Sequence, residues 1–412
     1  MNKSGTIWKY LSAAPHRSLF LMGAFQAILT ILWWVMELAG RAGLMESVSF
    51  SSIMPIWAHG FLMVYTFFPF FILGFLFTTF PNWMNGEKIK ANQYMTVCLL
   101  MAAGVILFYA GLIAGKFLLS TGLLLMLAGW AYAIIILFRV LFMAPAGDKR
   151  HAWVAGMAFI AGWLGLCAYA LWVLTDSREM LDFSRQAGIW FFMLPILMTV
   201  SHRMIPFFSS RVLENYVVVR PFGLLWLMVG CTVVHGALQL AGLQEYVWWT
   251  DMLLAGCAFY LSYIWRFFRS FRVRLLAVLH ISFAWLGIAM LFFGLQGMLL
   301  WLSDGDRYWF GLAPLHMLAV GYFASMVLGM ASRVTLGHGG FPLVLDNLTW
   351  LLFIAFQVVV LLRVIPDIFP GAAPLAPQFY LIASGVWLSC FLLWVIKYAP
   401  IYWRARVDGK AG

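Results

Sequence analysis

Residues 61–80 read FLMVYTFFPFFILGFLFTTF and carry no charged side chain. The stretch without Asp, Glu, Lys or Arg is longer still, and it extends from Ser47 to Gly86. An α-helix rises about 1.5 Å per residue, so roughly 20 apolar residues cross the hydrocarbon core of a bilayer. This stretch therefore predicts a transmembrane helix.

The composition of the whole chain also indicates a membrane protein. Of its 412 residues, 64% are hydrophobic and 10% are charged, against roughly 45–50% and 25% in soluble domains. Apolar blocks follow one another without a long polar insert or the alternation of a barrel. The sequence predicts an all-α polytopic helix bundle that forms one integral membrane domain over 1–412. We expect about twelve spans, near 18–38, 53–80, 94–114, 117–143, 153–174, 187–209, 222–241, 246–266, 275–300, 311–336, 349–366 and 379–401.

The distribution of Lys and Arg predicts the orientation of these spans. If the N-terminus lies inside, twenty of the 26 basic residues fall on the inner side. The other six are Arg41, Lys116, Arg178, Arg185, Arg307 and Arg363. Cytoplasmic loops carry an excess of Lys and Arg, so we expect both termini in the cytoplasm. The net charge of +11 then reflects these loops, and it does not indicate a nucleic-acid partner. Residues 1–17 are basic and lead into the first block, which predicts a retained first helix.

Histidines are the ionisable residues that stand out within the spans. Such residues are costly in a bilayer and mark candidate functional sites. Their depth predicts an outer layer of His59, His235 and His316 and an inner layer of His202, His280 and His338. His16 and His151 lie in basic segments beside the membrane, and we expect them to be solvated. We also expect Glu37 and Asp251, near outer helix ends, to be hydrated.

Neutral imidazole binds haem iron and copper, and histidines of separate helices can face one another in a bundle. His59 and His316 would form an axial pair on the outer side, with His235 as the substitute. His202, His280 and His338 would hold a second haem or copper. The alternative for each is a hydrogen bond to a neighbouring helix. Arg203 and Arg333 are either inner-end anchors or ligands of haem propionates or an anion. Residues suited to line a flat cleft are Trp57, Gly60, Phe61, Tyr65, Phe71, Gly74, Trp285, Gly321, Tyr322 and Gly329.

Four dispersed segments carry a resemblance to one family. His59-Gly60 with Gly74–Trp83 (GFLFTTFPNW) is similar to a GFLxTAxPNW segment, and Ser201–Phe208 (SHRMIPFF) stands at a GGRVIPMFT position. Pro314–Gly321 (PLHMLAVG) and Gly329–Leu343 (GMASRVTLGHGGFPL) resemble PLHxLxVG and MxxRxxLGHxGxPL. Leu279–Leu286 (LHISFAWL) is similar to LHxxYAWL. The chain thus resembles the NnrS family of haem- and copper-containing membrane proteins.

This resemblance implies a bacterial inner-membrane protein linked to nitric oxide and nitrosative stress. Its cofactors would be haem b and copper, and its partners nitric oxide or another small gas and membrane lipid. The resemblance names no electron donor and no reaction. Many members carry WHxHE at the second span, where this chain has His59, Phe61 in place of the second histidine and Leu62 in place of the glutamate. A copper site that needs all three would be altered here.

Two further functions fit a bundle of this kind. The first is a membrane transporter or carrier of haem, metal or a small anion, because twelve spans suit that class. Pro69 and Pro195 could break helices as in transporters, although the spans show no acidic relay. The second is an assembly protein without a cofactor. A faint similarity between Ser201–Arg203 and Ala331–Arg333 also suggests a four-helix unit repeated three times.

Overall fold

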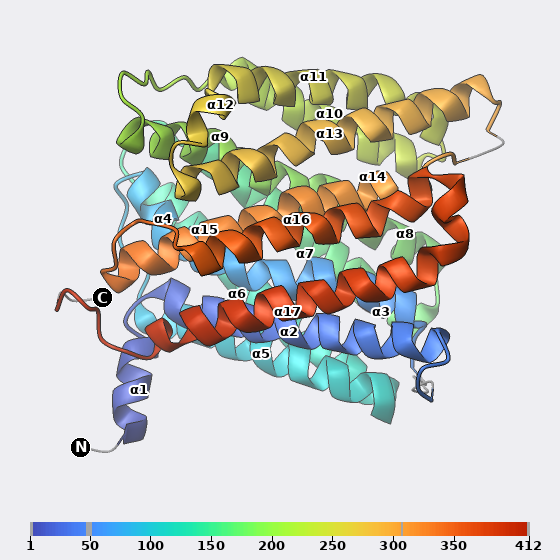
Figure 1. The fold of residues 1–412 in the computed structure, drawn as a ribbon. Helices are drawn as coiled ribbons and strands as arrows, with labels where there is room; N and C mark the ends of the chain where they lie inside the picture. The colour runs from blue at the N-terminus through green and yellow to red at the C-terminus, as the bar shows by residue number, and fades with distance from the viewer. Residues whose placement is uncertain (1–2, 47–51, 306–307, 410–412) are drawn as a thin grey trace. The chain divides into compact units, whose positions relative to one another are not determined.

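The computed structural model describes residues 3–46, 52–305 and 308–409 of the chain. Lys410 of the predicted inner set and Arg307 of the outer set lie outside the described residues. The described segments contain helices and no strand, which confirms the all-α fold class (Figure 1). Helices are expected because backbone groups in lipid must be hydrogen-bonded within the protein.

The chain divides into two compact units. Unit 1 comprises residues 1–192, 331–342 and 391–412, and unit 2 comprises residues 193–330 and 343–390. The chain therefore passes from one unit to the other within the sixth, tenth and twelfth spans and again in the connection after the tenth span, between residues 342 and 343. Each unit is built from membrane-spanning helices, and the prediction of one integral domain stays a prediction.

Unit 1 begins with a short helix that precedes the first span. Its helices are α1 (Lys3–Leu11), α2 (Pro15–Arg41), α3 (Pro55–Phe61), η1 (Leu62–Phe67), α4 (Phe68–Trp83), α5 (Ala91–Ala114), α6 (Lys116–Met143), α7 (Arg150–Thr175), α8 (Arg178–Gln186) and most of η2 (Ala187–Met193). The ends of α15 and α17 complete it. The start of α2 and the end of α17 meet, since Arg17 donates a hydrogen bond to the carbonyl of Arg404 at 2.8 Å. An even number of spans between them is consistent with this meeting.

Unit 2 contains the remaining helices. They are α9 (Leu194–Val212), α10 (Phe222–Leu240), η3 (Gln244–Tyr246), α11 (Trp248–Ile264), α12 (Phe267–Ser270), α13 (Arg274–Leu302), α14 (Ala313–His316), η4 (Met317–Ala324), α15 (Ser325–Gly339), α16 (Asn347–Ile368), η5 (Pro370–Leu375) and the first part of α17 (Ala376–Tyr402). Here α10 and α11 form a hairpin closed by η3, and α11 packs along α13.

Eleven segments in the described part of the chain are long and apolar enough to cross a membrane. They match eleven of the twelve predicted spans. The remaining one, near 246–266, is α11, which has 17 residues. At about 1.5 Å per residue it is about 26 Å long, slightly less than the hydrocarbon core of about 30 Å.

Three spans share an unusual form in which a π-helical segment interrupts the α-helix. These segments are η1, η2 and η4, and they belong to the second, sixth and tenth spans. The same three spans are the most buried, with 83%, 72% and 83% of their apolar windows covered, against 67% or less elsewhere. These π-helical segments recur every four spans, a spacing that agrees with the suggested threefold repeat of a four-helix unit. The helices continue through Pro69 and Pro195, each the second residue of the α-helix that follows a π-helical segment, so neither proline breaks its span.

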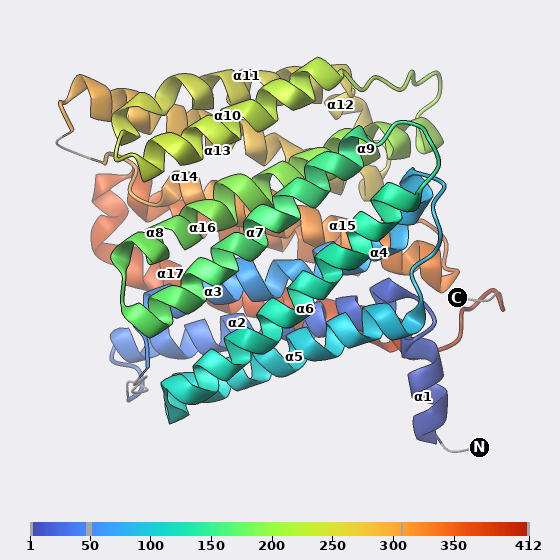
Figure 2. The same cartoon turned by 180° about the vertical axis from the view of Figure 1, so that it is seen from behind.

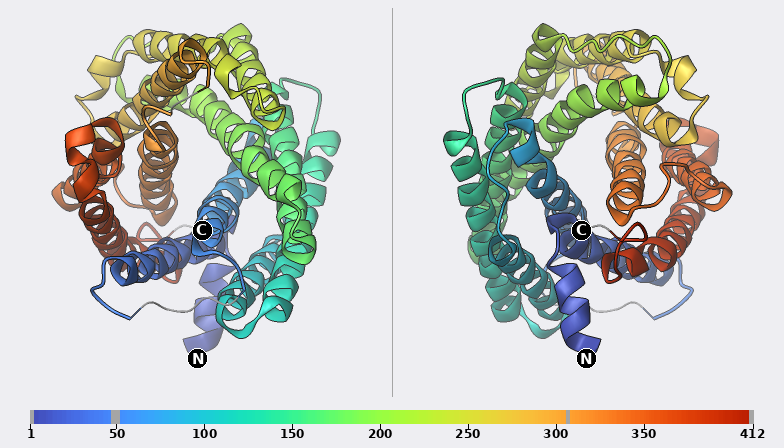
Figure 3. Two further views of the ribbon diagram at one scale, coloured as in Figure 1. Left: turned by 90° about the vertical axis from the view of Figure 1, so that its right-hand side faces the viewer. Right: turned by 90° about the vertical axis from the view of Figure 1, so that its left-hand side faces the viewer.

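Close packing of α5 against α6 shows how small residues join neighbouring spans. The two helices lie antiparallel and side by side, and the tight turn at Gly115 joins them (Figure 2). Both are seen end-on in Figure 3. A Cβ atom added at Gly122 would lie 2.6 Å from the carbonyl oxygen of Gly104. Membrane helices associate through such close backbone approach, since lipid supplies no hydrophobic force between them.

We expect Gly122→Ala to lower the thermal stability of the purified protein. The added methyl group must push α5 and α6 apart, and overpacking of this kind typically costs about 1–3 kcal/mol. Thermal unfolding in detergent, followed by tryptophan fluorescence, measures the effect. Gly230→Ala in α10 is the control, because no described atom lies within 4 Å of a Cβ built there. Equal melting temperatures for the two variants would contradict the role of Gly122.

Candidate functional site

His59 lies near the end of α3, shortly before the π-helical segment η1. Its ring stacks on Trp34 of α2, with centroids 4.0 Å apart and planes inclined by 13°. No described atom lies within 4 Å of a Cβ built at the neighbouring Gly60. An aromatic wall and an open neighbouring position suit a flat ligand. These features fit the predicted role of His59 beside haem.

His316 is the last residue of α14 and directly precedes η4. Its Nδ1 lies 2.9 Å from the carbonyl oxygen of Leu312, one turn earlier. A carbonyl oxygen only accepts, so Nδ1 donates and the neutral ring carries its lone pair on Nε2. A ligating histidine typically donates its other N–H to a carbonyl in this way, which orients the ring and raises its basicity. His316 therefore has the chemistry of a haem ligand.

The two histidines stand in the same local sequence pattern. Each is followed six residues later by a buried tyrosine within the π-helical segment, Tyr65 after His59 and Tyr322 after His316. The Tyr65 hydroxyl donates to the carbonyl of Ser184 at 2.6 Å within unit 1. The Tyr322 hydroxyl lies 3.0 Å from the hydroxyl of Ser201 within unit 2. The two spans thus repeat a His-x5-Tyr arrangement, and π-helical turns are often found at functional sites.

His235 forms a buried pair with Asp251, which contradicts the expected hydration of Asp251. The Nδ1 atom of His235 lies 2.6 Å from Oδ1 of Asp251, and both side chains are 1% exposed. Its Nε2 atom lies 3.4 Å from the amide nitrogen of Gln239. Both ring nitrogens thus have protein partners, so the ring is already engaged where an axial ligand would need a lone pair.

The sequence contained a signal for this pair. The connection between α10 and α11 is short, so His235 near the end of α10 and Asp251 near the start of α11 lie at similar depths. Asp251 was nevertheless placed at the hydrated end, because span boundaries from sequence alone are uncertain by a few residues. Oδ2 of Asp251 has no hydrogen-bond partner among the described residues.

His202 and His280 lie at the opposite end of unit 2 from His235. His202 approaches the carbonyl oxygen of Pro221, at the start of α10, at 3.3 Å. His280 approaches the hydroxyl of Ser209, near the end of α9, at 3.2 Å. Both rings are buried. Within unit 2, these two histidines therefore lie at the other end of the helices from His235, and which end faces outward stays a prediction.

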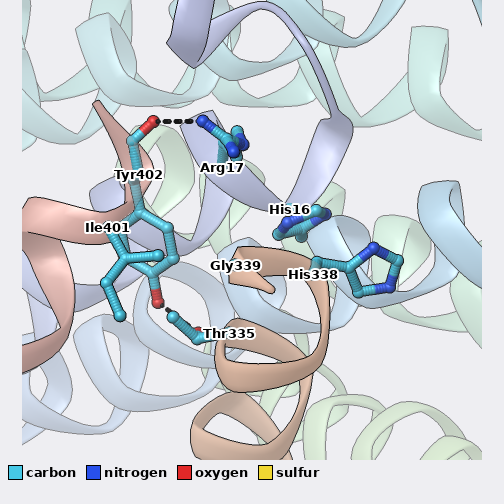
Figure 4. A pocket seen from close by; sticks show the side chains of 7 residues that line it. All are labelled: His16, Arg17, Thr335, His338, Gly339, Ile401 and Tyr402. Carbon is cyan, nitrogen blue, oxygen red and sulfur yellow. Dashed lines mark hydrogen bonds between the residues drawn. The ribbon is translucent and has the colours of Figure 1, made fainter. Parts of the chain in front are cut away.

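His338 does not stand alone at its end of unit 1. Its ring lies 4.5 Å from that of His16 between centroids, inclined by 43° (Figure 4). His16 is 2% exposed, and His151 is equally buried, so the expected solvation of both is wrong. The start of α2 is covered by the ends of α15 and α17, and no sequence pattern indicated this cover. His59 lies toward the far end of α2, so two histidine levels exist in unit 1 as well.

The two candidate arginines differ in their surroundings. Arg333 is 5% exposed within α15, which is unlike a solvated anchor at a helix end. Arg203 is half-buried in α9. Both were candidates for holding an anionic group, and their role stays a prediction.

Phe61 occupies the position where many NnrS sequences carry the second histidine of WHxHE. Its ring is buried and stacks on Tyr169 and Phe108, with centroids 4.2 Å and 4.5 Å away. Leu62, at the glutamate position, is fully buried. Aromatic packing thus replaces two potential ligands. No group of three His, Cys, Asp or Glu side chains that could hold a metal occurs among the described residues. Neither a phenylalanine nor a leucine side chain can ligate a metal, so these two positions contribute nothing to a copper site.

The glycines of the predicted cleft are partly filled by the protein itself. A Cβ added at Gly74 would lie 2.6 Å from Phe20, and one at Gly321 would lie 2.7 Å from Trp285. These two glycines therefore admit aromatic side chains of neighbouring helices. Gly60 beside His59 is exposed and has open space instead.

These features define a polytopic helical membrane protein with buried histidines at two levels. The sequence model of one family, described as NnrS protein, matches residues 10–406. The chain belongs to the NnrS family, and this membership supports a nitric-oxide-associated membrane protein. No curated protein matches the chain.

We expect removal of the Asp251 carboxyl group to destabilise unit 2. Asp251→Ala leaves His235 buried without its partner, and breaking a buried pair typically costs about 3–5 kcal/mol. Asp251→Asn keeps an oxygen that can accept from Nδ1, so its loss should be smaller. Thermal unfolding in detergent compares the two. Equal melting temperatures for Asp251→Ala and the wild type would show that the pair does not contribute to stability.

Proposed function

We propose that this protein binds haem b, with His316 of unit 2 and His59 of unit 1 as candidate ligands, and serves a redox or gas-handling role in the response to nitric oxide. The observation that carries the proposal is the repeated His-x5-Tyr arrangement, in which both histidines stand at the entrance of a π-helical segment. Family membership supplies the link to nitric oxide. The bound haem iron would supply gas binding and one-electron chemistry.

The residues around the two histidines would contribute binding and orientation. The carbonyl of Leu312 holds His316 in the tautomer that presents Nε2. Trp34 offers an aromatic face beside His59, and Tyr65 and Tyr322 fix the π-helical segments through their hydroxyl groups. If both axial positions are taken by histidine, a gas binds only when one histidine leaves. That arrangement favours electron transfer or sensing over turnover.

Copper is left out of this proposal, because Phe61 and Leu62 stand where the second histidine and the glutamate of WHxHE would supply ligands. A transporter of haem, metal or a small anion remains the second candidate. Transporter sites are typically formed by discontinuous helices. The spans that contain Pro69 and Pro195 stay helical through both prolines, which favours the haem proposal over the transporter.

We expect His316→Ala to remove or shift the haem bands of the purified protein while leaving it in the membrane. The substitution deletes the Nε2 ligand, and the π-helical backbone is held separately by Tyr322. A reduced-minus-oxidised absorption spectrum, before and after addition of nitric oxide, measures the effect. The control is His151→Ala, which removes another buried histidine that has no proposed ligand role. An unchanged spectrum in His316→Ala would exclude His316 from the site.

The proposed location is the cytoplasmic membrane, with both termini inside. The excess of Lys and Arg on the side of the termini supports this orientation. A reporter fused after residue 412 should be active only if it works in the cytoplasm. Activity of a periplasmic reporter at the same fusion point would overturn the orientation.

A further inference from the structure

A narrow cleft, without room for a water molecule, lies in unit 1 where α2 begins and where α15 and α17 end. We call it the Arg17 cleft, and its lining includes His16, Arg17, Thr335, His338, Gly339 and Tyr402 (Figure 4). Three membrane spans start or stop at this level. The cleft therefore lies at the depth where the spans leave the hydrocarbon core and meet the lipid headgroups.

Arg17 is a buried cation, and no carboxylate among the described residues forms an ion pair with it. It is 3% exposed. Its Nη1 atom donates to the carbonyl oxygens of Arg404 and Tyr402 at 2.8 Å and 3.4 Å. Within the described part of the chain, no partner is recorded for Nε or Nη2. A buried charge is costly unless it is paired and hydrogen-bonded, so the guanidinium group has both the charge and the donors to take an anion.

The histidine side chains add donors and no negative charge. Thr78 donates its hydroxyl proton to the carbonyl of Gly74. The hydroxyl oxygen of Thr78 lies 3.5 Å from Nδ1 of His16. Within the described residues, neither ring nitrogen of His338 has a hydrogen-bond partner. A neutral imidazole supplies one N–H donor, so His338 can add a third donor to the two of Arg17.

The charges nearby exclude a cation and favour an anion. Arg17 and Arg406 both act electrostatically on the two imidazole rings. Arg406 is itself neutralised by Asp408, with two hydrogen bonds of 2.9 Å and 2.7 Å. Asp408 is therefore occupied, and Arg17 supplies the net positive charge of the cleft. The cleft also lies at the N-terminus of α2, whose cap residue Ala14 offers no side-chain acceptor to the first N–H groups. Helix N-termini favour negative charge.

We propose that the Arg17 cleft binds a phosphate group, supplied by a phospholipid headgroup or by free phosphate. Arg17 binds two phosphate oxygens through Nε and Nη2, and His338 donates to a third. Arginine is suited to this task because its planar fork matches two oxygens at once. Basic pockets between transmembrane helices at the cytoplasmic surface are known to take anionic headgroups. The His16 and His338 rings part to admit the phosphate, because the cleft is narrow.

Thermal unfolding of the full-length protein in detergent tests this proposal. Melting temperatures are measured with inorganic phosphate, with short-chain phosphatidylglycerol and with the matching diacylglycerol, all at equal ionic strength. A ligand that binds only the folded state raises the melting temperature. We expect a rise of at least about 3 °C at saturation for one phosphate source. The diacylglycerol controls for the acyl chains.

Three variants locate the effect. Arg17→Gln should abolish the rise, but it also removes the bond to α17 and could prevent folding. His338→Phe keeps a ring beside His16 and leaves the Arg17 bonds intact, so it should reduce the rise in a folded protein. Arg404→Gln is the control, because this side chain is exposed at the same end and only its carbonyl contacts Arg17.

The outcomes distinguish a phospholipid headgroup from free phosphate, and they also show whether the Arg17 cleft binds phosphate at all. A rise with phosphatidylglycerol alone supports a lipid headgroup, and a rise with inorganic phosphate as well supports a free phosphate ligand. No rise in the wild type, or an equal rise in the wild type and His338→Phe, would overturn the proposal. Haem content is measured on the same samples. Loss of haem in His338→Phe would assign the cleft to the cofactor and also overturn it.

Discussion

Backbone N–H and C=O groups have no water to bond in the hydrocarbon core, and this constraint determines the architecture. Every span must keep its hydrogen bonds within the helix, which excludes open sheet edges and irregular loops at that depth. The second and sixth spans satisfy the constraint even where they contain Pro69 and Pro195, since each proline stands in the first turn of the α-helix that follows a π-helical segment. Unbroken helices therefore present side chains at fixed depths, and the histidine levels within each unit follow from those depths.

The same absence of water determines how charged and polar side chains are held. His235 and Asp251 share a hydrogen bond deep in unit 2. Arg17 satisfies the last carbonyls of α17 with one nitrogen and keeps two others for a further partner. The buried pair of unit 2 thus satisfies its own members, whereas the guanidinium group of Arg17 keeps donors that suit a further ligand.

Much of the fold could be predicted from the sequence, because span length and apolar composition are local properties. Eleven predicted spans coincide with observed helices, and α11 falls short only in length. The depth of His59 and His316 was also predictable, since depth follows from position along a span. The residues that each histidine contacts could not be predicted from the sequence. His16 and His338 are separated by nearly the whole chain, and their stacking depends on which helix ends pack together. Hydrophobic patterns also do not distinguish π-helical from α-helical turns, so η1, η2 and η4 were invisible beforehand.

The π-helical segments carry a consequence for how these spans tolerate insertions and deletions. A π-helical turn closes its hydrogen bond over one more residue than an α-helical turn. Losing one residue from η1 would restore a regular α-helix without breaking the span. Each residue of an α-helix advances the chain by about 100°, so α3 would then rotate relative to α4. His59 would face a different direction while Phe71 kept its own. Deletion of a single residue from such a segment would therefore turn the histidine side chain about the helix axis, while the span itself stayed helical.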